Sequence, residues 1–480
     1  MDSVSAARSN TVYSLLAFGL RLVANMALFV GIARFYGPTA FGHFSLAHVY
    51  FSIMLLIADF GYDFFLATEI GRNTHVTADL TRRVMPLKIY LSVIAIGLMV
   101  ALAFVGQSDR EVRTLMMVLA LGIPANTLMT MAAAVFRGNQ NVSSEASVAL
   151  TQNVLLLAFL VIIGMLGLPL LSVACAFVIS RIYGFVVLWQ KARKRFPELE
   201  GTARLPVSAE TRVLVGIGFT FGLHVLFSTL YFQIDTILLS YLRGDEAVGL
   251  YQAVMKLAAL VLVFNEVAIT AVIPILAQAF EDGQERWTRI GRVVSKSLHL
   301  VGGFFGLLFF LCPEQILGVV YGAGKFAGAI PVMRVFAVIL LVRFGMETYA
   351  MMLTTARKQQ LRMIVVMLAT IFNVTANLFV IPRFGILGAA WVSLGTNGLI
   401  ALFYISFLSI QARRLLPLVD SGQLMIVAGF GIVGGILWNL GVNSLVAVVP
   451  LATTLSLGLI YLGFSRAEQK LVFSFFRLRA

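Results

Sequence analysis

Residues 37–44 read GPTAFGHF, and residues 244–251 read GDEAVGLY. The two stretches share glycines at their first and sixth positions and an aromatic residue at the eighth, at an offset of 207 residues. Each stretch follows one long apolar segment and precedes another. The stretches therefore mark the same corner in two copies of one helical unit.

A second pair of matching stretches lies further along the chain. Asn153-Val154 with Phe159 corresponds to Asn373-Val374 with Phe379, at an offset of 220 residues. If each copy contains six membrane spans, an even number, both copies have the same orientation in the bilayer. Such a parallel repeat is related by an axis along the membrane normal, as in transporters that alternate access between two halves.

Composition places the chain in a membrane. Hydrophobic residues make up 60% and charged residues only 12%, which is too little charge for the surface of a soluble protein. The net charge of +14 is explained by the Lys and Arg that collect in cytoplasmic loops. No zinc-finger spacing or RNA-binding aromatic motif accompanies it, so nucleic acid is not an expected partner. Cys175 and Cys312 lie in apolar segments and predict no disulfide framework.

Apolar stretches of about 20 residues are long enough to cross the hydrocarbon layer. The sequence predicts fourteen, with twelve as the alternative count. They lie near 11–34, 43–68, 86–106, 112–136, 146–167, 169–190, 212–240, 247–278, 294–320, 329–354, 360–381, 386–410, 421–440 and 443–464.

The distribution of basic residues tests this count. With a cytoplasmic N-terminus, 25 of the 36 Lys and Arg fall in inner segments, six in outer segments and five within spans. The inner set includes Lys88, Arg137, Lys296 and Arg357, and the outer set includes Lys325. Because one missed span would invert every later loop, this bias favours an even count with both termini cytoplasmic. Residues 466–479 mix basic and aromatic side chains and predict a helix on the inner surface.

The predicted fold is an all-α polytopic membrane protein with two parallel six-helix bundles around a central cavity. We expect the first bundle in residues 1–200 and the second in 201–411. Residues 412–480 would add two further transmembrane helices and the interfacial C-terminal helix.

Several motifs resemble those of one family. Ile32–Phe44, IARFYGPTAFGHF, is similar to the segment that follows the first span in polysaccharide flippases of the Wzx type. Asp59-Phe-Gly61 and Glu69-Ile-Gly-Arg72 resemble the end of the second span in those proteins. Similar segments of the second half are Tyr321-Gly322 with Phe326, and Phe384–Ala390. Together these motifs cover nearly the whole chain.

The resemblance implies membership of the multidrug/oligosaccharidyl-lipid/polysaccharide exporter superfamily. It implies a flippase that moves a polyprenyl-pyrophosphate-linked oligosaccharide from the cytoplasmic to the periplasmic leaflet of a bacterial inner membrane. The product would serve O-antigen or exopolysaccharide biosynthesis. Implied partners are the lipid-linked substrate and membrane lipids, with a polysaccharide polymerase and a chain-length regulator beyond them.

Two other functions stay open. A cation-coupled drug or small-molecule antiporter of the same superfamily would favour an acidic cavity, whereas five basic residues lie within these spans. A membrane polysaccharide polymerase or ligase commonly carries its acceptor site on a large outer loop, whereas the longest polar connection here, 191–211, is predicted to be cytoplasmic.

Charged residues within spans are the candidate site residues, because each costs about 2.5–3.5 kcal/mol near a helix centre and usually faces a cavity or a partner. Arg21 lies near mid-depth of the first span with Asn25 on the same face, and a guanidinium there could bind a pyrophosphate bidentately. Lys256 and Arg343 are the other phosphate candidates. Arg21 pairing with an acid inside the bundle is the structural alternative.

The acidic candidates for ion coupling or gating are Asp59, Asp235, Glu266 and Glu347. Asp235 and Lys256 lie at matching depth on consecutive spans and predict a charge pair. Arg343 and Glu347 are four residues apart, so mutual neutralisation is the structural alternative. The sequence leaves open whether Arg181 lines a cavity or covers the outside of its bundle.

Enzymatic motifs are missing from the sequence. It contains no GxxxxGK[ST], HExxH or GxSxG, and no His/Cys cluster with metal-ligand spacing. We therefore expect no catalytic residues, no metal and no cofactor. Without ATP hydrolysis, coupling to H⁺ or Na⁺, the membrane potential or a substrate gradient would drive transport.

Overall fold

The computed structural model describes residues 2–106, 109–200, 229–230, 232–411 and 420–469. The chain divides into two compact units, Met1–Ser240 and Tyr241–Ala480. The predicted boundaries at 200/201 and 411/412 adjoin residues that the structure does not describe. The division into 1–200, 201–411 and 412–480 therefore stays a prediction.

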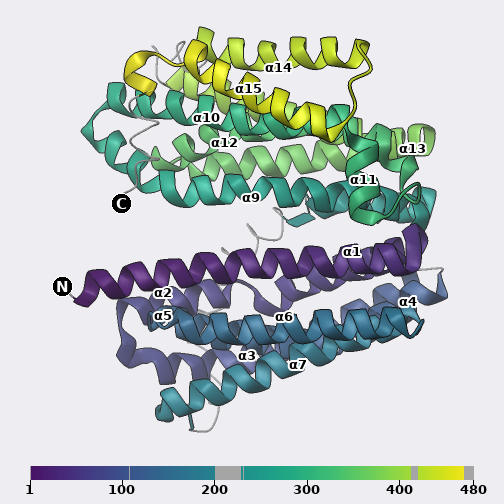
Figure 1. Cartoon of the computed structure of the whole chain (residues 1–480). Coiled ribbons are helices and arrows are strands. Elements are labelled where there is room, and N and C mark those ends of the chain that lie inside the picture. Colours follow the sequence, from purple (N-terminus) through teal and green to yellow (C-terminus); the bar gives the residue numbers. More distant parts are fainter. Residues whose placement is uncertain (1, 107–108, 201–228, 231, 412–419, 470–480) are drawn as a thin grey trace. The chain divides into compact units, whose positions relative to one another are not determined.

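The described parts of the first unit are helical (Figure 1). Short 3₁₀ turns at Thr74–Val76 and Pro197–Glu200 accompany its α-helices. The helices are α1 (Asp2–Asp59), α2 (Tyr62–Arg72), α3 (Thr77–Gly106), α4 (Arg110–Ala120), α5 (Gly122–Gly138), α6 (Val142–Met165) and α7 (Leu170–Arg195).

The second unit is also helical where it is described, and a helix ending at residue 243 leads into it. Its outermost helices are the predicted C-terminal pair, which packs on α10 through a core that includes Leu307, Phe430 and Leu459. The helices are α9 (Asp245–Asp282), α10 (Gln284–Leu311), α11 (Pro313–Tyr321), α12 (Ile330–Thr355), α13 (Gln359–Gln411), α14 (Ser421–Asn439) and α15 (Leu445–Gly463).

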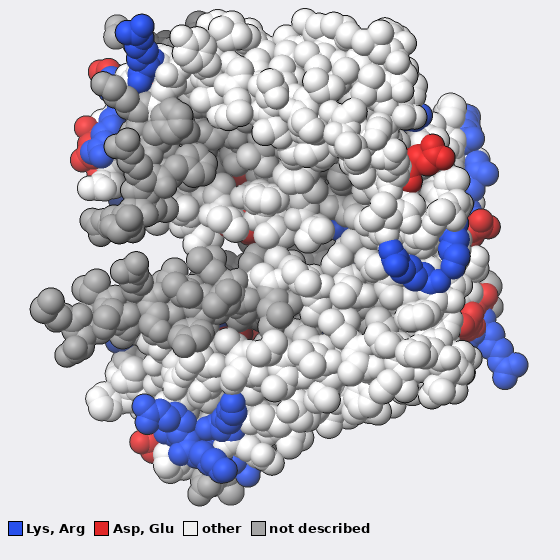
Figure 2. Space-filling view, viewed as in Figure 1, with Lys and Arg blue, Asp and Glu red and all other residues white. Residues whose placement is uncertain are grey.

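Eleven helical segments among the described residues are long and apolar enough to cross a membrane. Two of them, in α1 and α13, contain a break at Gly37 and Gly385 and therefore form two consecutive spans each. Thirteen of the fourteen predicted spans therefore have a helix among the described residues, the predicted span 212–240 lies mostly outside them, and the all-α fold class is confirmed. In each unit, charged side chains gather near the helix ends and leave a wide uncharged surface between them (Figure 2).

The repeated glycines have the same backbone conformation. Gly37 has φ 83° and ψ −175°, and Gly244 has φ 84° and ψ 179°. This region of positive φ with extended ψ is adopted almost only by glycine. Each glycine stops one helix and starts the next, so the sequence repeat is also a repeat of local structure.

Two predicted spans are interrupted in the structure. The predicted span 43–68 breaks between Asp59 and Tyr62, where Phe60 and Gly61 have positive φ. The predicted span 294–320 ends at Leu311, and Pro313, which has no N–H to donate to the preceding turn, begins α11. The short turn at 167–169 is confirmed, because α6 ends at Met165 and α7 begins at Leu170.

Candidate functional site

A cavity of about 450 Å³ lies within the first unit, between α1, α5, α6 and α7. Its polar lining consists of two arginines and two asparagines: Asn25, Arg137, Asn153 and Arg181. Its apolar lining comes from Leu22, Ala24, Leu28 and Leu156. No carboxylate belongs to this described lining, so the cavity is basic and amphipathic.

The helices that line the cavity present these side chains with helical periodicity. Leu22, Asn25 and Leu28 recur every three residues on one face of α1. Asn153 and Leu156 repeat the spacing on α6. The cavity is therefore lined by span interiors rather than by loops.

The two arginines are held differently. The Arg181 guanidinium lies over the ring of Phe177, 4.5 Å from its centroid and one turn earlier on α7. Arg137, in the last turn of α5, has an Nη1 atom 3.4 Å from the buried Glu145 carboxylate. Its side chain keeps 40% of its surface exposed, so Arg137 can still meet a ligand.

Only part of this lining was predicted as a site. Asn25 lines the cavity, and Arg181 belongs to its wall rather than to the outside of the bundle. The side chain of Arg21 lies outside the described residues, so the pyrophosphate role of Arg21 stays a prediction. The sequence predicts a cytoplasmic position for Arg137 and marks Asn153 only as a repeat position.

The repeat counterpart of Asn153 is enclosed in protein. Asn373 on α13 accepts a hydrogen bond from Asn377 at 3.0 Å and donates one to Thr396 at 3.4 Å. Asn373 is 1% exposed. The same repeat position therefore lines a cavity in the first unit and belongs to a closed polar network in the second.

The second unit contains a mixed-charge cluster. Glu347 on α12 interacts electrostatically with Arg343 on the same helix, with Arg362 on α13 and with Glu266 on α9. Arg362 also donates a hydrogen bond to the hydroxyl of Thr354 on α12. Arg343 and Glu347 therefore interact, as their spacing predicted, but they do so within a larger cluster of two arginines and two glutamates.

The remaining basic and acidic candidates are distributed over both units. Lys256 lies on α9 in the second unit, and Asp235, 3% exposed, belongs to the first. The predicted pair between them stays a prediction. Asp59 ends α1 and binds the buried amine of Lys88 at 2.6 Å, and Asp63 on α2 is the second partner of that amine. Lys88 is therefore a buried side chain rather than part of an exposed cytoplasmic segment.

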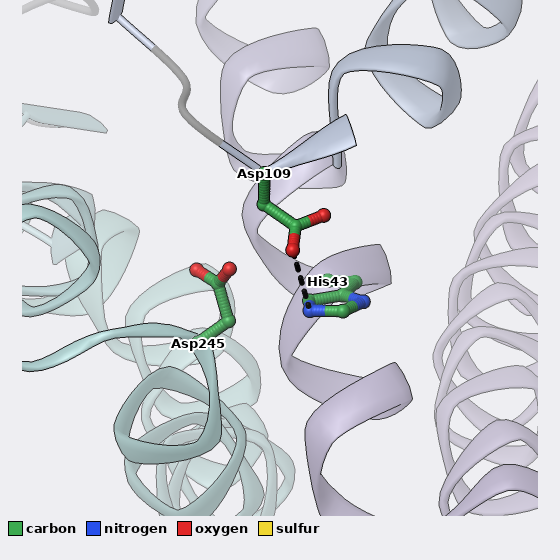
Figure 3. Close-up of side chains that lie close together, drawn as sticks. All are labelled: His43, Asp109 and Asp245. Carbon is green, nitrogen blue, oxygen red and sulfur yellow. Dashed lines mark ion pairs between the residues drawn. The ribbon is translucent and has the colours of Figure 1, made fainter. Parts of the chain in front are cut away.

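A further group of titratable side chains, His43, Asp109 and Glu111, lies where α1 packs against the start of α4. His43 is 8% exposed, and its Nδ1 atom is 2.8 Å from Glu111. Figure 3 shows its ring facing Asp109, the N-cap of α4, with Nε2 4.0 Å from the carboxylate. Asp245, drawn in the same figure, belongs to the second unit.

Solved structures show which known fold this chain shares. The fold is similar to that of the lipid II flippase MurJ in an inward closed conformation, with a TM-score of 0.70, 11% identity and coverage of 96% of this chain and 100% of that chain. It is also similar to an inward-facing multidrug resistance transporter of the MATE family, with a TM-score of 0.68, 15% identity and coverage of 85% and 99%. The fold is thus that of the MOP-superfamily membrane transporters.

The sequence places the chain more narrowly within that class. The chain belongs to the family described as polysaccharide biosynthesis proteins, whose model matches residues 7–280. The MatE model matches residues 221–379. A curated relative from Haloferax volcanii, the probable low-salt glycan biosynthesis flippase Agl15, is 23% identical over 403 residues, which are 80% of this chain and 81% of the relative. These relatives are transporters and flippases, in agreement with the prediction that the chain is not an enzyme.

Proposed function

We propose that this protein is a flippase that moves a polyprenyl-pyrophosphate-linked oligosaccharide across a bacterial inner membrane, toward the periplasm. The basic cavity of the first unit is the observation that carries this proposal. Two guanidinium groups and two amides converge there without a carboxylate in the described lining. The oligosaccharide would serve O-antigen or exopolysaccharide biosynthesis, and a polymerase and a chain-length regulator would act on it afterwards.

The chemistry of the cavity suits such an amphiphile. A pyrophosphate presents several anionic oxygens, which guanidinium groups bind through paired, charge-assisted hydrogen bonds. Asn25 and Asn153 offer both donors and acceptors, as sugar hydroxyls require. The leucines of the same wall suit the first isoprene units. Because Arg137 lies at the predicted cytoplasmic end of α5, the cavity is placed to receive a headgroup from the inner leaflet.

The cluster of the second unit supports a second part of the proposal. Glu266 and Glu347 lie within a group that also holds two arginines, so net charge there is balanced. Binding of H⁺ or Na⁺ by one carboxylate would shift that balance and could drive alternating access. The same carboxylates are the observation that keeps a cation-coupled drug antiporter as the second candidate.

The test uses a host strain that lacks the gene and carries either the wild-type chain or Arg181→Gln. We expect single lipid-linked repeat units to accumulate with Arg181→Gln, and surface polymer to fall by roughly tenfold, because a hydrogen bond to a charged group contributes about 1.5–3 kcal/mol. Mass spectrometry of the polyprenyl-linked glycans and gel analysis of the polymer give the two readouts.

Arg334→Gln is the matched control. Arg334 is also a span arginine that lies over an aromatic ring, Trp438 at 4.4 Å, but it belongs to the second unit. A wild-type amount of surface polymer in the host that lacks the gene and has no second flippase would contradict the proposal. Loss of drug resistance with normal glycolipid pools would favour the antiporter.

A further inference from the structure

Two buried lysines occupy equivalent places in the repeat. Lys88 of α3 and Lys296 of α10 lie 208 residues apart, one residue from the offset of 207 that relates Gly37 to Gly244. Lys88 is 0% exposed and Lys296 is 2% exposed. The ammonium group of each contacts two carboxylates, as a buried charge requires.

The carboxylates come from different parts of the fold. In the first unit they are Asp59 and Asp63, which flank the break between α1 and α2 and belong to the repeated helices. In the second unit the amine of Lys296 is 2.6 Å from Asp420 and 3.0 Å from Glu468. Asp420 is the N-cap of α14, and Glu468 follows α15. Both therefore belong to the added C-terminal helices.

The residues around the Lys296 amine are tightly packed. The ring of Phe464 lies 5.5 Å from its amine. Gly422 has no side chain where a Cβ would come within 3.0 Å of that amine and 2.1 Å of the Gly463 carbonyl oxygen. The start of α14 and the end of α15 thus close over the lysine together.

The counterpart of Asp59 has a different environment. At the offset of 207, Asp59 corresponds to Glu266 on α9. Glu266 lies within electrostatic range of Glu347, in the cluster that contains Arg343 and Arg362. The second unit therefore carries a carboxylate at the position that pairs with lysine in the first unit, yet its lysine binds the C-terminal helices.

From this divergence we infer that Lys296 is the docking site of the C-terminal helix pair, and that its use there leaves Glu266 to the mixed-charge cluster. The apolar core between α10, α14 and α15 supplies the hydrophobic contacts of the pair. The ion pairs fix the position, because an unpaired lysine in that place would be a buried, uncompensated charge. The inference does not rest on the proposed substrate.

The experiment cuts the chain after folding. A protease site is inserted at residues 412–419, the full chain is purified in detergent through an N-terminal tag, and retention of the C-terminal fragment after cleavage is measured. We expect the wild-type fragment to stay bound. In Asp420→Asn with Glu468→Gln, which leaves Lys296 without an anionic partner, we expect the fragment to dissociate about tenfold faster or more.

Two further variants separate the lysine from other effects. Asparagine and glutamine keep side-chain oxygens for the capping contacts of Asp420 with Gln423 and of Glu468 with Ser465. Adding Lys296→Met to the two amides removes all three charges and should restore retention toward wild type. Lys88→Met, the same change at the equivalent lysine, should leave retention unchanged.

Equal retention in the wild-type chain and in the double amide variant would overturn the inference, because the apolar core alone would then hold the pair. Equal loss in the double and triple variants would also overturn it, since the carboxylates would then act through the caps. If the double variant cannot be purified, recovery of the triple variant with its fragment bound supports the docking role, and failure of both contradicts it.

Discussion

At the scale of single residues, the repeat contains pairs of corresponding positions that hold the same side chain in different environments. Asn153 and Asn373 are such a pair, because one lines the cavity and the other lies in a closed hydrogen-bond network. The side chain is the same, so any difference in its role comes from its neighbours. A matched substitution can therefore separate binding from stability.

We predict that Asn373→Ala lowers the stability of the protein, whereas Asn153→Ala lowers its transport activity. Asn373→Ala leaves buried groups of Asn377 and Thr396 without that partner and should lower stability by about 1–3 kcal/mol. Asn153→Ala should lower flipping while the melting temperature in detergent stays close to wild type. Thermal unfolding and the surface-polymer assay check the two halves; a lower melting temperature for Asn153→Ala with normal polymer would contradict the assignment.

At the scale of helices, much of the architecture could be read from the sequence. Hydropathy, the positions of basic residues and the repeated glycines predicted fourteen spans, and the described helices agree with thirteen of them. The breaks at Gly61 and Pro313 lie within apolar stretches, where hydropathy does not change, so local backbone chemistry was the only available signal. Sequence patterns predicted elements better than they predicted the places where elements bend.

The repeated helix break provides a prediction at this scale. Gly37→Ala and Gly244→Ala should each destabilise the protein by about 1–3 kcal/mol, because alanine rarely adopts positive φ with extended ψ. No heavy atom lies within 4 Å of a Cβ built at either position, so the cost would be one of backbone conformation rather than of crowding.

Gly97→Ala is the control for those variants. Gly97 is helical and equally open around a built Cβ. Alanine favours helix by about 0.8–1 kcal/mol over glycine, so Gly97→Ala should be neutral or stabilising. Melting temperatures in one detergent compare all three; unchanged values for Gly37→Ala and Gly244→Ala would mean that the break does not depend on glycine.

At the scale of the whole molecule, the candidate site was harder to predict than the fold. A charge within a span indicates that a partner or cavity exists, but its direction depends on helix rotation, which hydropathy does not determine. Arg181 was therefore undecided, and Arg137 was counted as a loop residue because it lies near a helix end. The sequence places Lys88 and Lys296 in inner segments because they lie near the starts of the predicted spans 86–106 and 294–320, whereas α3 and α10 begin about three turns earlier and both lysines are buried.

The orientation of the chain in the membrane is the prediction on which the direction of transport depends. Lys325 and Arg357 flank α12 at opposite ends, and both are exposed.

In a background of Cys175→Ser and Cys312→Ala, an impermeant maleimide added to intact cells, with the outer membrane permeabilised, should label Lys325→Cys. It should label Arg357→Cys only after the inner membrane is opened. Since α12 is one span, the two results must be opposite, and labelling of both in detergent confirms that each thiol is reactive. The reverse pattern would invert every loop, place the Arg137 end of the cavity toward the periplasm, and contradict loading of the cavity from the inner leaflet.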